Sequence, residues 1–225
     1  AGSIMQGVTR NPIADPGLLG INAGAGLALI LGYAIFGSMH YSLIMLVCLI
    51  GSVLAACLVF GLSYQRNKGY NQLRLILAGA MVSTLFTAIG QAVTLYFDLS
   101  TTVIGWQAGG LAQINWKMLT FIAPIILLGL IVAQLLSHQL TILSLNETVA
   151  KALGQSTFLM TVLLLGVVLF LSAASVALVG TVSFIGLIIP HFIKMFVGKN
   201  YRILLPMTAF AGATFMLWVD LASRT

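Results

Sequence analysis

Seven long apolar runs divide this chain, with short polar links between them. The runs cover residues 20–37, 41–62, 73–96, 118–136, 157–179, 182–196 and 203–222. A helix needs about 20 apolar residues to cross a bilayer, so the pattern predicts an all-α, polytopic membrane protein with one transmembrane domain over residues 1–225. Pro190 and His191 interrupt the short sixth run. That run predicts either a short tilted span or a re-entrant helix shielded by neighbouring protein.

Basic residues gather in alternate links. If the opening segment is cytoplasmic, one side holds eight of the ten Lys and Arg residues: Arg10, Arg66, Lys68, Arg74, Lys151, Lys194, Lys199 and Arg202. The other side holds Lys117 and Arg224. Links with an excess of Lys and Arg face the cytoplasm in membrane proteins. The pattern therefore predicts the orientation as well as the spans.

The composition agrees with a chain solvated by lipid. Hydrophobic residues make up 60% of it and charged residues 6%, and the mean hydropathy is +1.10. A soluble domain has about 25% charged residues. The net charge of +6 is spread thinly over the links, whereas a nucleic-acid surface carries a dense basic patch. We therefore expect membrane lipid and no nucleic acid among the partners.

Little in the sequence points to catalysis. Gly198-Lys199-Asn200 lacks the other residues of a phosphate-binding loop, and no catalytic set or metal-ligand spacing occurs. Cys48 and Cys57 are nine residues apart in one apolar run, too far for a disulfide across a helix. We expect no enzyme activity, no metal and no cofactor. Two alternatives remain: an ion-coupled transporter, for which Asp220 is the one candidate carrier of charge, and an intramembrane enzyme.

One amphipathic segment stands apart from the apolar runs. Residues 143–154 read Leu-Ser-Leu-Asn-Glu-Thr-Val-Ala-Lys-Ala-Leu-Gly. Ser144 and Glu147 have the spacing of a capping box, and Gly154 can end a helix in the left-handed conformation. The pattern predicts a helix that starts after Ser144 with Val149, Ala150 and Leu153 on one face. Such a helix either lies on the membrane surface or docks a cytoplasmic protein.

Several stretches resemble one transporter family. Residues 11–25 read Asn-Pro-Ile-Ala-Asp-Pro-Gly-Leu-Leu-Gly-Ile-Asn-Ala-Gly-Ala, residues 184–191 read Phe-Ile-Gly-Leu-Ile-Ile-Pro-His, and residues 200–206 read Asn-Tyr-Arg-Ile-Leu-Leu-Pro. With Leu77-Ala-Gly79, the Trp106–Trp116 stretch, residues 143–154 and Asp220–Arg224, these resemble, in order, the iron-siderophore, haem and vitamin B12 type ABC importer permeases. Asn146 replaces a glycine usual in that family, and Lys151 replaces an arginine.

The resemblance implies an architecture and partners. Family members have about ten spans, so this chain would lack the first, most of the second and the last. Two permease subunits, identical or related, would pair in the bacterial cytoplasmic membrane, with two ATPase subunits below and a substrate-binding protein outside. The implied cargo is an iron(III)-siderophore complex, with haem or cobalamin as the alternative.

The resemblance also assigns roles to residues. The segment that contacts the ATPase would contain Ser144, Leu145, Asn146, Glu147, Ala150, Lys151, Leu153 and Gly154. Arg224 would dock the binding protein. The translocation path or its gate would involve Asn11, Pro12, Gly186, Pro190 and His191.

Overall fold

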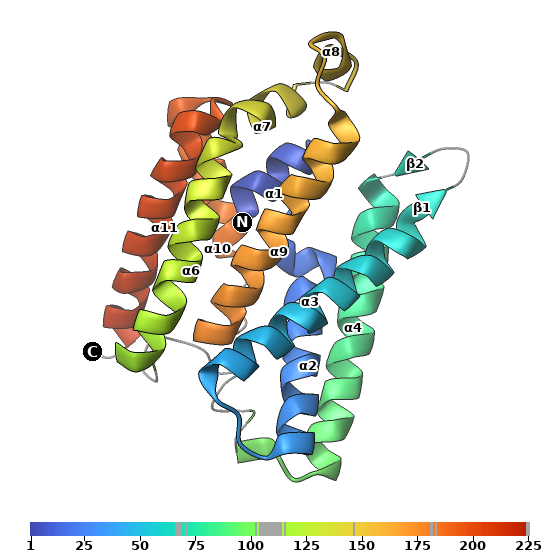
Figure 1. Cartoon of the computed structure of the whole chain (residues 1–225), viewed down its shortest axis with the longest axis vertical. Coiled ribbons are helices and arrows are strands. Elements are labelled where there is room, and N and C mark those ends of the chain that lie inside the picture. Colours follow the sequence, from blue (N-terminus) through green and yellow to red (C-terminus); the bar gives the residue numbers. More distant parts are fainter. Residues whose placement is uncertain are drawn as a thin grey trace. The chain divides into compact units, whose positions relative to one another are not determined.

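The computed structural model describes residues 1–65, 69, 70, 72–101, 103, 114, 116–145, 147–180, 182 and 184–223. Their fold is helical, as predicted (Figure 1). The helices are α1 (Gly2–Thr9), the 3-10 helix η1 (Pro16–Leu19), α2 (Ile21–Phe36), α3 (Tyr41–Ser63), α4 (Gln72–Tyr96), α6 (Trp116–Leu135), α7 (Ser137–Leu143), α8 (Glu147–Ala152), α9 (Thr157–Val179), α10 (Ile185–Val197) and α11 (Tyr201–Ser223). Two short strands, β1 (Tyr64–Gln65) and β2 (Gly69–Tyr70), pair antiparallel between α3 and α4.

Each of the seven apolar runs corresponds to a helix. Within the described part of the chain, five helices are long and apolar enough to cross a membrane: α3, α4, α6, α9 and α11. The other two, α2 and α10, have 16 and 13 residues. Although Pro190 and His191 interrupt the sixth apolar run, α10 continues through both residues. Proline removes one intrahelical hydrogen bond, and another part of the chain makes up for it here.

Contacts between residues divide the chain into two compact units. Unit 2 comprises residues 16–125 and 172–182. Its helices α2 and α3 cross where Gly24 faces Gly51, so closely that a Cβ on either glycine would overlap the carbonyl oxygen of the other. Ser52 of α3 donates to the carbonyl of Ile21 at 3.3 Å beside this crossing. Small residues allow such close approach of helices in lipid.

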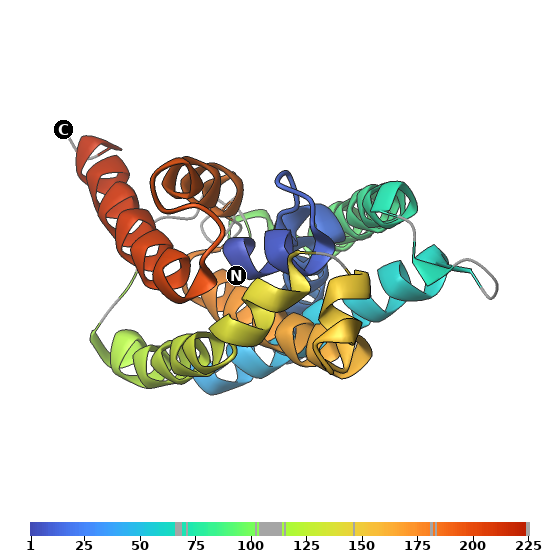
Figure 2. The same cartoon turned by 90° about the horizontal axis from the view of Figure 1, so that it is seen from above.

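Unit 1 comprises residues 1–15, 126–171 and 183–225. Its centre is α1, whose residues Gly2 to Val8 are all buried. Helices α7, α10 and α11 each pack against α1, and Figure 2 shows α7 (yellow) beside α1 (blue). The short opening helix thus forms the core of this unit.

Candidate functional site: the α7–α8 link and the α1–α10 junction

Helix α8 lies in the link between α7 and α9 (Figure 1). Its C-terminal cap is the one the sequence predicts: Gly154 has φ of +76°. The N–H of Gly154 donates to the carbonyl of Lys151 at 2.9 Å, and the N–H of Gln155 donates to that of Ala150 at 3.0 Å. Together these two bonds form a Schellman motif. The glycine therefore fixes where α8 stops.

The predicted N-terminal cap of α8 is wrong. Ser144 is the residue after α7, and its Oγ donates to the carbonyl of Thr141 at 2.8 Å. Helix α8 begins at Glu147. The sequence pattern did not predict α7, the helix that precedes Ser144. The Ser144 hydroxyl therefore donates to a carbonyl at the end of α7 instead of capping α8. Asn146 and the side chain of Glu147 lie outside the described part of the chain.

The predicted apolar face of α8 is only partly buried. Ala150 is completely buried, whereas Leu145, Val149 and Leu153 are 56%, 43% and 62% exposed. Val149 lies on α8, and Leu145 and Leu153 lie in the turns before and after it. We call these three exposed side chains the α8 stripe. Lys151 is also exposed. Ala150 thus packs α8 against its own chain, whereas the α8 stripe and the neighbouring Lys151 side chain are exposed.

The basic links of unit 1 meet at one end. Gln134, near the end of α6, donates to the carbonyl of Arg202 at the start of α11, at 2.9 Å. The Nζ of Lys194, in the last turn of α10, lies 5.8 Å from the centre of the Tyr201 ring. Within this unit, the links that carry Lys151, Lys199 and Arg202 therefore lie at the same end, as the charge pattern predicts.

Two of the quoted motifs meet where α1 crosses α10. A Cβ on Gly2 would overlap the carbonyl of Gly186, and a Cβ on Gly186 would overlap Oδ1 of Asp15. Asp15 is 9% exposed and lies against the first turn of α10, where a carboxylate is favoured by the helix dipole. Only glycine fits at position 2, and a Cβ at position 186 would displace the Asp15 carboxylate. Asp15 of the 11–25 stretch thus contacts Gly186 of the 184–191 stretch.

Gln6 of α1 completes this junction. Its Nε2 donates to the carbonyls of Gly186 and Leu187, at 3.5 and 3.3 Å, and its Oε1 accepts from Nζ of Lys194 at 2.6 Å. Gly186 lies four residues before Pro190, so it is the residue whose carbonyl a proline at 190 leaves without its helical donor. A buried glutamine therefore bridges both ends of α10.

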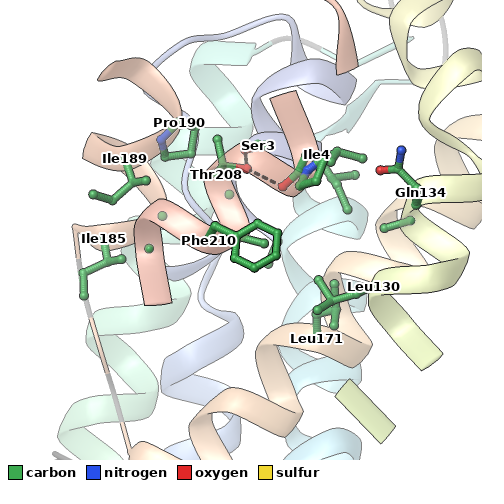
Figure 3. A pocket seen from close by; sticks show the side chains of 18 of the residues that line it. Ser3, Ile4, Leu130, Gln134, Leu171, Ile185, Ile189, Pro190, Thr208 and Phe210 are labelled. Carbon is green, nitrogen blue, oxygen red and sulfur yellow. Dashed lines mark hydrogen bonds between the residues drawn. The ribbon is translucent and has the colours of Figure 1, made fainter. Parts of the chain in front are cut away.

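An apolar cavity of about 400 Å³ lies in unit 1 between α1, α6, α9, α10 and α11. Figure 3 shows Ile4, Leu130, Leu171, Ile185, Ile189 and Phe210 in its wall, with the Ser3 hydroxyl donating to Thr208 at 3.1 Å. Of the residues predicted for the path, Gly186 and Pro190 line this cavity. Asn11 and Pro12 belong to the turn after α1, and His191 is exposed on α10, outside the cavity wall.

Sequence reasoning overlooked the residues that hold this site together. Gln6, Gly2 and Lys194 received no role, and Asp15 was noted only as part of a motif. A signal was present: a proline inside an apolar helix needs a polar donor nearby, and Gln6 is buried in the adjoining core helix. Arg224, predicted to dock a binding protein, lies outside the described residues.

Comparison with known proteins identifies the family of this chain. A model of the FecCD transport family matches residues 1–225. The iron(3+)-hydroxamate import system permease protein FhuB of Bacillus subtilis is 35% identical over the whole chain, which spans 58% of that protein's length. The hemin transport system permease protein HmuU of Yersinia pestis is 36% identical over the whole chain, with 69% of its length covered.

The fold agrees with these relatives. A solved inward-facing structure of a transporter assigned to the metal-chelate ABC type has a TM-score of 0.86 and 33% identity, covering 99% of this chain and 72% of that one. The five membrane-length helices found among the described residues fit this polytopic transporter fold. The chain belongs to the FecCD transport family.

Proposed function

We propose that the chain is the permease subunit of an ATP-driven importer, or a large part of one, in the bacterial cytoplasmic membrane. The observation that carries the proposal is the exposed α8 stripe: Val149 on the helix and Leu145 and Leu153 in the turns that flank it. The helix itself is held by a buried alanine and a fixed C-terminal cap. Apolar side chains on a polar link at the basic end need a partner, since contiguous exposed apolar patches mark interaction sites. ATPase subunits docked from the cytoplasm fit that need.

The other partners follow from this role. A second permease subunit, identical or related, would complete the path, and residues 1–225 would belong to one transmembrane domain of each subunit. A substrate-binding protein would dock on the opposite side, at Arg224. Asn11, Pro12, Gly186, Pro190 and His191 remain our candidates for the path or its gate, with Gly186 and Pro190 supported by their place in the cavity wall.

The proposed cargo is an iron(III)-siderophore complex. The cavity wall is mostly aliphatic and aromatic, and its polar groups are neutral hydroxyls and amides such as Ser3, Thr208 and Gln134. Such a wall suits a bulky organic chelate better than a bare cation, which would need charged or carbonyl ligands. Haem or cobalamin is the alternative, because the hemin permease HmuU is as similar to this chain as the iron-hydroxamate permease FhuB.

The proposal is tested on the α8 stripe in the complete transporter, reconstituted with its ATPase subunits in proteoliposomes. Leu153→Glu places a charge in the proposed contact and should abolish co-purification of the ATPase and ATP-dependent uptake. Glu147→Lys should leave the fold intact and uncouple hydrolysis from uptake. The control is Ile35→Glu, an aliphatic residue 72% exposed at the end of α2, on the opposite side in the predicted alternation.

Uptake is measured with radio-iron hydroxamate siderophore, hemin and cobalamin in parallel. Transport of the siderophore supports the proposed cargo, and transport of only one of the other two replaces it. Uptake that persists without ATPase and collapses with an ion gradient would overturn the proposed function. So would full ATPase binding by Leu153→Glu.

A further inference from the structure

A hydrogen bond joins α7 to the first residue of α11. Tyr201 is the first residue of α11, so its N–H has no acceptor within that helix. The Oγ1 of Thr141, on α7, accepts this N–H at 3.2 Å and itself donates to the carbonyl of Ser137 at 2.8 Å. Asn200 Oδ1 accepts the N–H of Arg202, the next residue, at 3.2 Å. The start of α11 therefore has one cap from its own chain segment and one from α7.

Helix α7 is also bonded to the residue that follows the C-terminal cap of α8. After the cap at Gly154, the chain turns, and Nε2 of Gln155 donates to the carbonyl of Gln139 at 3.0 Å. Leu143, the last residue of α7, is 1% exposed. Helix α8 thus cannot shift far without moving α7 or breaking this bond.

Helix α7 also packs without space against α1. Leu140 is completely buried, and a Cβ on Gly7 would lie 2.7 Å from Cδ1 of Leu140 and 2.9 Å from the Tyr201 ring. Three helices therefore meet at Gly7 with no room to slide. Close-packed interiors of this kind transmit displacement instead of absorbing it.

From these contacts we propose that α7 transmits the movement of α8 to α11 and α1, and that Thr141 is the positioning residue at its junction with α11. The inference rests on the proposed function, in which α8 docks the ATPase. Movement of α8 can also pass directly to α6 and α9, the helices before and after the α7–α8 segment in the chain. The contacts of α7 provide a second route. The route ends on α1, α10 and α11, three of the five helices that border the cavity. It includes α10 because Gln6 joins α1 to α10.

The test uses Thr141→Val in the complete transporter with its ATPase subunits and binding protein, in proteoliposomes. Valine keeps the shape and removes the acceptor. Thr141→Ser restores the hydroxyl. The matched control is Thr214→Val in α11, whose hydroxyl bonds only to Phe210 and Ala211 of its own helix. The readout is the amount of cargo moved per ATP hydrolysed, with radio-iron hydroxamate siderophore, hemin or cobalamin as the probe, whichever the wild type transports.

Thr141→Val should lower cargo per ATP by about three- to tenfold, the size expected when one buried hydrogen bond is lost, with ATPase binding unchanged. Thr141→Ser and Thr214→Val should behave as the wild type. Damage to folding alone would lower transport and hydrolysis together and leave their ratio unchanged, which would overturn the inference. Gln155→Leu, which removes the bond from the α8 cap to Gln139 of α7, should reproduce the drop. This variant decides the matter if Thr141→Val yields no folded protein.

The two proposals fail in different ways. If Leu153→Glu still binds ATPase, or the wild type shows no ATP-dependent uptake of any probe, the proposed function fails. If Leu153→Glu loses the ATPase while Thr141→Val and Gln155→Leu keep the wild-type ratio, only the role of α7 is wrong.

Discussion

The side-chain amide of Gln6 donates to the carbonyl of Gly186, the group that Pro190 leaves without its helical donor. The same glutamine accepts from Lys194, two turns further along α10. A helix with a proline at its middle would expose an unpaired carbonyl to an apolar interior, at a cost of several kcal/mol in lipid. Gln6 removes that cost and explains why α10 runs unbroken.

Replacing Gln6 with leucine should destabilise the protein by about 1–3 kcal/mol, because it leaves the Gly186 carbonyl and the Lys194 ammonium without this partner. Denaturant unfolding in detergent measures the change. Gln91→Leu, on the exposed side of α4, is the control and should change stability by less than about 0.5 kcal/mol. Equal effects of the two changes would show that the bridge contributes nothing.

Gly51→Ala should destabilise the crossing of α2 and α3 by about 1–3 kcal/mol, since the added methyl would overlap the carbonyl of Gly24 and the Cβ of Ala28. Gly61→Ala in the same helix meets no atom within 4 Å. That change should leave stability the same or raise it by up to about 1 kcal/mol. Thermal unfolding in detergent distinguishes them, and a neutral Gly51→Ala would contradict the packing.

Gly154→Ala should weaken the end of α8 by about 1–2 kcal/mol, because alanine at φ of +76° brings its Cβ against the backbone. Gly154→Asn should cost less, since asparagine tolerates this conformation. Hydrogen exchange of the α8 amides is the measurement. Faster exchange confined to α8 in the alanine variant, partly reversed in the asparagine variant, is expected; no change in either would contradict the role of the cap.

Cysteines placed on the two predicted sides should react from opposite faces of the membrane. In a background with Cys48 and Cys57 changed to alanine, Lys151→Cys and Lys199→Cys should resist a membrane-impermeant maleimide in intact spheroplasts and react after permeabilisation. Tyr96→Cys, at the exposed end of α4, should react in both cases. Labelling of Lys151→Cys from outside would reverse the orientation and remove the basis for ATPase docking at α8.

The local features of this fold could be predicted from residues alone. Apolar runs of membrane length predicted the helices, because lipid gives the backbone no partner except its own. The left-handed end of α8 followed from Gly154, whose freedom of φ is intrinsic. The alternation of charge predicted that Lys151, Lys199 and Arg202 share one end. Each of these depends on a residue and its near neighbours in sequence.

The contacts between distant segments were decided only by the tertiary structure. The capping box at Ser144 failed because α7 precedes it and takes the hydroxyl. Pro190 leaves the Gly186 carbonyl without its helical donor, and Gln6, 180 residues from Gly186 in sequence, supplies another one. Val149, Ala150 and Leu153 were expected on one face, and only the packed chain decides that Ala150 alone of the three is covered. The sequence pattern indicates which polar groups and apolar side chains need a partner. Which partner lies close enough to contact them depends on how distant segments pack.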